Sequence, residues 1–387
     1  MNRNNLLLSL LLAVSLILRL IHLNFPNQFY FDENYTAFTA QAIAKKNSLD
    51  IWTPSVRPID PPRGYEWSHP PLARLTIAVA IKILGNKPWV WRLPSVVAGI
   101  LSLLLTYAVG KHLFSKTTGI IAAFLFSFDG LHFASSRIAT IESLLVCLIL
   151  ASLYLASRRH LYLSAFAAGM AIATKWVALI VIPLIILFYR YKNPKTSPIH
   201  TLLILIALPS FIYAFSYLFF FTVGFNLSDF ISLQITMFTH SLSIEKIHPF
   251  ASPWYLWPLG LQPIPYFAQA GKELWALPNF LIFWLGLASI TLCIASGRRR
   301  SSKAIKLTFT SYLAFLLPWI LLSLSPWKSR TTYLYYYLPA LPFLHLLSAY
   351  WLSRGLKKPG LARTATLVTL AMIPPVFFAI YPRLVGL

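Results

Sequence analysis

The chain has 387 residues, of which 57% are hydrophobic and only 11% are charged, and its mean hydropathy is +0.66. These values exclude an ordinary soluble domain and predict an integral membrane protein that crosses the bilayer several times. The formal net charge of +23 would suit a nucleic-acid-binding protein, but the basic residues lie in short clusters between apolar runs, as in loops that face anionic lipid. We therefore expect membrane lipid, and no nucleic acid, as a partner.

Eleven apolar stretches approach the length of a membrane-spanning helix, which is about 20 residues. Nine of them lie near residues 5–24, 92–112, 117–134, 138–157, 200–222, 278–296, 305–324, 332–352 and 361–381, and two shorter ones lie between 160 and 190. A twelfth stretch, 72–84, contains Arg74 and Lys82 and follows two prolines. We expect this stretch to lie along the membrane surface or to re-enter the membrane instead of crossing it.

The basic residues set the orientation of these spans. With eleven spans and the N-terminus inside, the loops on the inner side contain Arg3, Lys111, Lys116, Arg158, Arg159, Arg190, Lys192, Lys195, Arg298, Arg299, Arg300, Lys303, Lys306, Arg354, Lys357, Lys358 and Arg363. This asymmetry is the one that the positive-inside rule describes. The sequence thus predicts an all-α polytopic membrane protein, one domain of residues 1–387, with long external loops at about 25–91 and 225–277.

The acidic residues lie on the opposite side of the predicted membrane. None of the ten is in an inside loop: eight are in the two external loops, and Asp129 and Glu142 are near the outer ends of the third and fourth spans. Ionisable groups at membrane depth are costly and mark functional sites by default. We therefore expect a polar site on the outer face of a multi-pass protein of the plasma membrane.

Asp32 and Glu33 follow the first span directly. Taken alone, they would be read as carboxylates that stabilise a helix start, but the other acids favour a site. The short external connections and the C-terminal tail contain only five cations, Arg137, Lys175, Lys328, Arg330 and Arg383, and the first four are each at or near the outer end of a helix. Carboxylates beside such cations suit a substrate with an anionic head and a lipid anchor. For Arg137 a structural ion pair with Glu142 or Asp129 is the alternative.

Several motifs, in this order, resemble the protein O-mannosyltransferase family, which belongs to the polytopic GT-C class of glycosyltransferases. They are Phe31-Asp32-Glu33, His69-Pro70-Pro71-Leu72-Ala73-Arg74, Trp91-Arg92-Leu93-Pro94-Ser95, Phe128-Asp129-Gly130, Ser136-Arg137-Ile138 with Glu142, Thr174-Lys175-Trp176, the run 252–259 and the run 333–343. Two features depart from the family: Tyr336 stands where its members usually have His, and the second external loop has no β-trefoil insertion of the eukaryotic kind.

The resemblance implies that a sugar, mannose in this family, passes from a polyprenyl phosphate to a Ser or Thr hydroxyl of a protein. Asp32 would be the general base, with Glu33 as an orienting partner of Arg137. Arg137, helped by Lys175 and Arg330, would stabilise the departing phosphate. A single displacement of this kind inverts the anomeric centre. The further residues expected to bind substrate are Glu142, His69 and Trp254.

Some alternatives stay open at this stage. His69 could contact the acceptor or cap a helix, and Trp254 could stack on a sugar or belong to an interfacial aromatic belt. His240 and His248 lie too far apart in a loop to indicate a metal site, so no metal and no cofactor is expected.

A transferase that acts on a lipid or glycan acceptor is a rival function. A transporter or scaffold would need charges in the span centres. An oligomer is compatible with the sequence.

Overall fold

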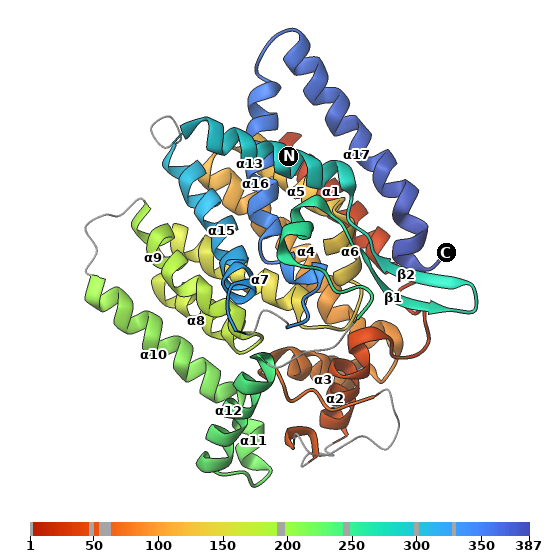
Figure 1. Cartoon of the computed structure of the whole chain (residues 1–387), viewed down its shortest axis with the longest axis vertical. Coiled ribbons are helices and arrows are strands. Elements are labelled where there is room, and N and C mark those ends of the chain that lie inside the picture. The colour runs from red at the N-terminus through yellow and green to blue at the C-terminus, as the bar shows by residue number, and fades with distance from the viewer. Residues whose placement is uncertain are drawn as a thin grey trace.

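The computed structural model describes residues 3–45, 50–53, 63–191, 198–242, 248–297, 302–326 and 330–387. Several predicted positions lie outside these residues, namely Asp60, Lys192, Lys195, Glu245, Lys328 and Arg298 to Arg300. Within the described part the chain is helical except for turns, connecting segments and one two-stranded sheet (Figure 1). The predicted all-α architecture is confirmed.

Each of the eleven predicted stretches contains a helix. The helices are α1 (Arg3–Leu20), α4 (Pro88–Leu113), α5 (Lys116–Ser127), α7 (Glu142–Ser157), α8 (Leu161–Ile172), α9 (Val181–Tyr191), α10 (Pro198–Ser216), α13 (Phe280–Ala295), α15 (Lys303–Ser323), α16 (Leu341–Gly355) and α17 (Leu361–Val385). Among the described residues, α4, α10, α15 and α17 are long and apolar enough to cross a membrane, by length and composition alone. Most of the others are shorter apolar helices.

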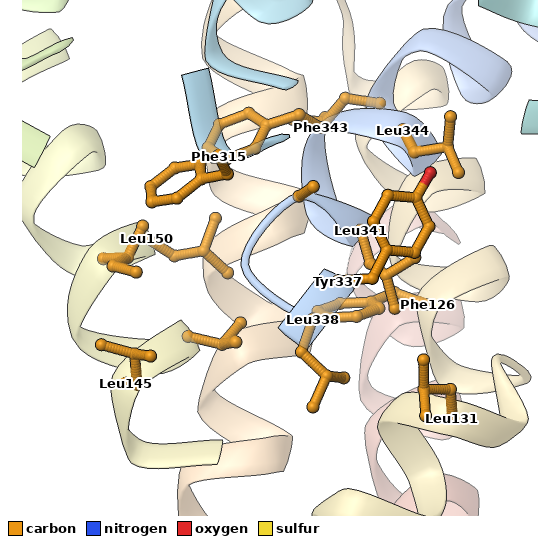
Figure 2. Close-up of a cluster of buried hydrophobic side chains, with 14 of the residues drawn as sticks. Phe126, Leu131, Leu145, Leu150, Phe315, Tyr337, Leu338, Leu341, Phe343 and Leu344 are labelled. Atoms are coloured by element: carbon orange, nitrogen blue, oxygen red, sulfur yellow. The ribbon is translucent and has the colours of Figure 1, made fainter. Parts of the chain in front are cut away.

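The core lies between α4, α5, α7 and α16. Figure 2 shows part of it, where Phe126 of α5, Leu145 of α7 and Leu341 of α16 belong to one hydrophobic cluster and are almost fully buried. The peripheral helices α1, α10 and α17 instead leave large apolar side chains exposed, among them Ile17 at 59% and Phe211 at 63%. Apolar side chains on the outside of a helical bundle are expected where the solvent is lipid.

The predicted third span, 117–134, is interrupted. α5 ends at Ser127, and a short helix, α6 (Gly130–Ser135), follows after an extended residue, Asp129. The Asp129 carboxylate accepts hydrogen bonds from the backbone N–H groups of Leu131 and His132, which makes it the N-cap of α6. Its other oxygen lies 2.9 Å from Nε2 of His345 in α16, and both side chains are fully buried. Asp129 is therefore a structural acid that joins α6 to the core.

The first external loop folds into η1 (Phe31–Asn34), α2 (Thr36–Ala44), η2 (Asp50–Trp52) and α3 (Leu72–Leu84). α3 packs against α2 and α4 through Ala73, Ile77, Ala78 and Ile81. Its 13 residues extend about 20 Å, which is less than the about 30 Å of a hydrocarbon core. These dimensions support the prediction that 72–84 does not cross the membrane.

The predicted span 200–222 contains a second, short helix after α10, α11 (Leu218–Thr222). The segment predicted to be the second external loop contains α12 (Leu227–Leu242), η4 (Trp254–Leu259) and a hairpin of β1 (Ile264–Gln269) and β2 (Lys272–Ala276). The hairpin was not predicted from the sequence. Its turn residues Ala270 and Gly271 both have positive φ, as a two-residue turn between twisted strands requires. β2 packs on α6 and α17 (Figure 1), so the hairpin covers this part of the bundle.

We expect a reporter inserted at Ala270 to lie outside the cell and one inserted after Lys358 to lie inside. Three spans, α13, α15 and α16, separate these positions, and an odd number of crossings places the two on opposite sides. Labelling of single engineered cysteines in intact cells with a membrane-impermeant reagent measures this directly. Equal labelling at both positions would contradict the topology.

Candidate active site

The site is built on the turn that follows α1. Phe31 has a φ of +48°, a conformation that is uncommon for residues other than glycine, and its ring is held 4.6 Å from that of Tyr266 and 5.9 Å from that of Tyr335. Sparsely populated backbone conformations persist where the surrounding structure over-determines them. Here the turn places Asp32 and Glu33 on different sides of the segment.

Glu33 points into the protein, where it is fully buried. Arg92 of α4 donates to both of its carboxylate oxygens, at 2.8 and 2.9 Å, and the backbone N–H of Ala139 donates to one of them at 3.0 Å. The same guanidinium donates to the backbone carbonyls of Leu23, Phe25, Pro26 and Gln28. The expected pairing of Glu33 with Arg137 is therefore wrong: Glu33 holds Arg92, and the pair fixes the chain that carries Asp32.

Asp32 has a different environment. Its side chain is partly accessible, and among the described residues no group donates a hydrogen bond to its carboxylate. Burial, together with the negative charges of Glu142 and Glu66, raises the pKa of Asp32 to about 8, although the positive charge of Lys175 opposes this rise. A carboxylate that has no internal donor and a pKa near neutrality is suited to accept a proton.

A cavity of about 260 Å³ is lined by residues from four distant parts of the chain, among them Lys175, whose charge acts on Asp32; Asp32 itself does not line it. Its polar lining includes His69, Lys175 and Arg330. Lys175 Nζ lies 2.9 Å from an oxygen of Glu142 and 4.8 Å from the ring centre of Tyr336. Three of the predicted substrate-binding residues, His69, Lys175 and Arg330, thus meet at one cavity, and Glu142 contacts it through Lys175.

Aromatic rings form one wall of the cavity. Trp319 and Tyr336 stack with ring centres 4.6 Å apart, and the Arg330 guanidinium lies 5.5 and 5.6 Å from these two ring centres. Arg330 also donates to the backbone carbonyl of Ser241 in α12. Trp257, fully buried, packs against the same two rings. The cation–π contacts hold Arg330 over these rings, and among the described residues only its Nε has a hydrogen-bond partner.

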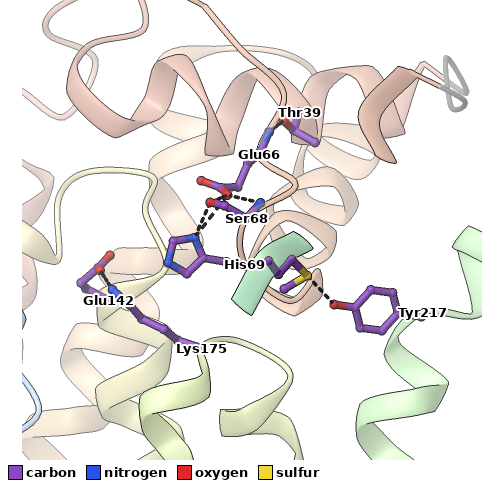
Figure 3. Close-up of polar contacts among 8 residues, drawn as sticks. Thr39, Glu66, Ser68, His69, Glu142, Lys175 and Tyr217 are labelled. Atoms are coloured by element: carbon purple, nitrogen blue, oxygen red, sulfur yellow. Dashed lines mark hydrogen bonds and ion pairs between the residues drawn. The ribbon is translucent and has the colours of Figure 1, made fainter. Parts of the chain in front are cut away.

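His69 joins the cavity to Glu66. Figure 3 shows its imidazole between the Ser68 and Glu66 side chains and the Lys175–Glu142 pair. His69 Nδ1 lies 3.2 Å from Glu66 Oε1, and the Ser68 hydroxyl donates to the same oxygen at 2.6 Å. Burial alone would raise the pKa of Glu66, but His69 and these hydrogen bonds lower it to about 2. The helix start at Leu72 has no side-chain cap, so His69 lines the cavity instead of capping α3.

Two predicted residues lie away from this cavity. Arg137 is 4% exposed, and its guanidinium donates to the backbone carbonyls of Leu18, Arg19 and Ile21 at the end of α1. It pairs with neither Glu142 nor Asp129, and it stabilises the last turn of that helix. Trp254 donates to the Ser323 hydroxyl at 3.1 Å and does not line the cavity.

Sequence reasoning missed Trp319 and Ser68 as parts of the site. Trp319 lies within a predicted span, where a single tryptophan carries no signal of function. From the sequence, Tyr336 stands out only as a departure from the family. Among the described residues no group of His, Cys, Asp and Glu could hold a metal ion.

Two family models match the chain. The model of the family described as "Dolichyl-phosphate-mannose-protein mannosyltransferase" matches residues 68–217, and that described as the "C-terminal four TMM region of protein-O-mannosyltransferase" matches residues 226–387. The chain belongs to the protein O-mannosyltransferase family. It is a membrane mannosyltransferase of the GT-C type, and the family resemblance of its sequence motifs is confirmed. By sequence, a comparison with curated proteins finds no significant match.

Solved structures support the same fold. The Saccharomyces cerevisiae protein O-mannosyltransferase Pmt1-Pmt2 complex bound to the sugar donor is similar with a TM-score of 0.78 and 13% identity, over 100% of this chain and 90% of that one. ArnT from Cupriavidus metallidurans bound to undecaprenyl phosphate has a TM-score of 0.66 and 15% identity, over 97% and 64%. The oligosaccharyltransferase AglB from Archaeoglobus fulgidus, in complex with an inhibitory peptide and a dolichol-phosphate, has a TM-score of 0.61 and 14% identity, over 100% and 56%. The mannosyltransferase thus spans less than two thirds of the length of the last two.

We expect Glu33→Ala to destabilise the mannosyltransferase by about 3–5 kcal/mol, because it leaves the buried Arg92 charge without its carboxylate. Asp32→Ala, the neighbouring substitution, removes no internal hydrogen bond and should leave the unfolding temperature almost unchanged. Thermal unfolding of both variants, purified in the same detergent, measures the difference. Equal unfolding temperatures would contradict the structural assignment of Glu33.

Proposed function

We propose that this enzyme transfers mannose from a polyprenyl phosphate to a Ser or Thr hydroxyl of a protein, on the external face of the membrane. One observation carries the proposal: the Asp32 carboxylate, which no described residue binds, lies within electrostatic reach of a cavity with Lys175 and Arg330 in its wall. Transfer of a sugar from a phosphate to a hydroxyl requires a base for the hydroxyl proton and cations for the departing phosphate.

Lys175 and Arg330 replace Arg137 as the groups that would hold the donor phosphate. Both line the cavity, whereas the Arg137 guanidinium donates to backbone carbonyls at the end of α1 and just beyond it. Glu142 holds Lys175 in the absence of donor, and a phosphate that binds would share this ammonium group with it. The arginine can form two parallel hydrogen bonds to phosphate, and the lysine adds a point charge.

An apolar cavity of about 880 Å³ lies on another side of Trp176, which also lines the charged cavity, and would receive the polyprenyl tail. The two share Trp176, and the apolar one runs between α8, α9, α10 and α12, where Ile182, Leu205 and Pro209 line it. A lipid phosphate bound there has its charged end beside Lys175 and its isoprenoid chain along lipid-facing helices. The relative ArnT is described with undecaprenyl phosphate bound, which supports a carrier of this class.

In the proposed reaction the acceptor hydroxyl attacks the anomeric carbon, and the bond from that carbon to the phosphate oxygen breaks. Asp32 accepts the hydroxyl proton, and the phosphate leaves with the electron pair of the broken bond. The cations stabilise the charge that develops on it. A single displacement of this kind yields a product with inverted anomeric configuration. His69, held by Glu66, faces the same cavity and is placed to contact the acceptor.

We expect Asp32→Asn to lower turnover about a hundredfold or more, because asparagine keeps the size of the side chain and removes the proton acceptor. Donor binding should stay close to that of the wild type. The assay uses the purified enzyme with a polyprenyl-phosphate mannose and a Ser/Thr-containing peptide, and follows the product and its anomeric configuration. Near wild-type turnover would refute the base, and a retained anomer would refute single displacement.

The same assay as a function of pH provides a second test of Asp32. The carboxylate is an active base only when it has lost its proton, and its pKa is raised to about 8. Activity should therefore be low below this pH and rise as the pH increases through it. With an unperturbed carboxylate, activity would already reach its plateau near pH 5. The profile is measured at saturating donor, so that titration of the donor phosphate does not determine it.

We expect Lys175→Ala and Arg330→Gln to raise the donor concentration required for half-maximal rate by about tenfold or more, since each removes a charge-assisted contact of roughly 1.5–3 kcal/mol. Arg137→Ala should instead lower stability and leave donor use by the folded fraction unchanged. Activity is compared at equal amounts of folded protein. A donor defect confined to Arg137→Ala would return the phosphate role to that residue.

A further inference from the structure

A second charged cavity, of about 520 Å³, lies at the other end of the helical bundle. We call it the basic cavity and define it by its cations, Arg354, Lys357 and Lys358, and its hydroxyl groups, Ser115, Thr118 and Ser302. It forms where α4 ends, where α5 and α15 begin and where α16 ends. Nothing in the mannosyl transfer reaction uses these residues.

The basic cavity lies across the membrane from the active site. α4 runs from Pro88, beside the external loop, to Leu113, which lines the basic cavity. Its 26 residues extend about 39 Å, enough to cross a hydrocarbon core of about 30 Å. In Figure 1 the connection between α16 and α17 lies at the top, and α2, α3 and α12 lie towards the bottom. A ligand of the basic cavity is therefore separate from the mannosyl donor.

The charges of the basic cavity are all of one sign. The described residues that line it include three cations and no acid, and like charges in proximity repel one another unless an anion joins them. Arg354 is held towards the cavity wall: its guanidinium donates to the Tyr350 hydroxyl at 2.8 Å and lies 5.8 Å from the centre of that ring. An arginine fixed in this way, with two lysines beside it, matches the geometry of a phosphate group.

The remaining lining is suited to the glycerol and acyl part of a lipid. Leu113, Phe114 and Tyr350 provide apolar surface beside the cations. Thr118 donates to the Ser353 hydroxyl at 3.0 Å, which joins α5 to α16 in the floor of the cavity. We propose that the basic cavity binds the phosphate headgroup of an anionic membrane lipid on the face opposite to the active site.

The basic clusters of the inner loops attract anionic lipid in a diffuse way, so the test must separate a site from a charged surface. Arg354→Gln/Lys357→Gln removes two charges from the basic cavity. Arg158→Gln/Arg190→Gln removes two charges from the ends of α7 and α9, on the same predicted side but outside the cavity. Both variants have the same net charge and an unaltered active site.

Binding of phosphatidylglycerol to the purified proteins in neutral detergent is measured by native mass spectrometry, with phosphatidylcholine and glycerol phosphate as further probes. We expect the cavity variant to bind phosphatidylglycerol about tenfold or more weakly than the wild type, the control variant to bind it normally, and neither other probe to compete. Equal losses in both variants, or no loss in the cavity variant, would overturn the proposal. So would glycerol phosphate that binds as tightly as the lipid.

Folding of the variants is checked by mannosyl transfer, which depends on the other end of the bundle. If the double variant does not fold, the single changes Lys357→Gln and Lys358→Gln provide the same comparison, because both side chains are exposed. Each should then weaken phosphatidylglycerol binding, and unchanged binding in both would overturn the proposal.

Discussion

The buried contact between Arg92 and Glu33 is the interaction on which the external site depends. The Arg92 guanidinium spreads its hydrogen bonds over both oxygens of Glu33 and over carbonyls of the segment between α1 and η1. Removal of two such charges from water is costly and is compensated only when the donors and acceptors are satisfied. Since this network is nearly complete, the segment has one arrangement against α4, and the backbone that carries Asp32 has a rigid support.

The two adjacent carboxylates thus have separate tasks, which their surroundings determine. Glu33 has an arginine and a backbone N–H as partners and keeps the fold, whereas Asp32 has neighbouring acids and no donor among the described residues. The pattern is repeated in the rest of the chain. Asp129 and Arg137 complete helix ends in the core, while Lys175 and Arg330 line the cavity, Lys175 beside Glu142 and Arg330 beside the rings of Trp319 and Tyr336 and the carbonyl of Ser241.

The sequence was informative about the architecture because hydropathy and the distribution of basic residues act over whole segments. It predicted a helix in each of the eleven apolar stretches, and the ordered motifs indicated the family. It could not assign Arg137, because an arginine at a helix end is equally suited to a phosphate and to free carbonyls; which of these it meets depends on how α1 packs against the segment after α6. The hairpin and Trp319 were missed for a related reason, since their roles arise only from contacts between distant segments.

The lack of a donor to Asp32 has a consequence for the complete catalytic cycle. Transfer would convert an ionised carboxylate into a neutral acid and a phosphodiester into a monoester, so one negative charge would migrate from the Asp32 side of the cavity to Lys175 and Arg330, and the total charge would stay the same. The net charge of the site would therefore not change during the transfer step. The enzyme would return to its starting state only when the proton on Asp32 reaches bulk water, and the partly accessible face of this side chain is the exit that the structure leaves for it.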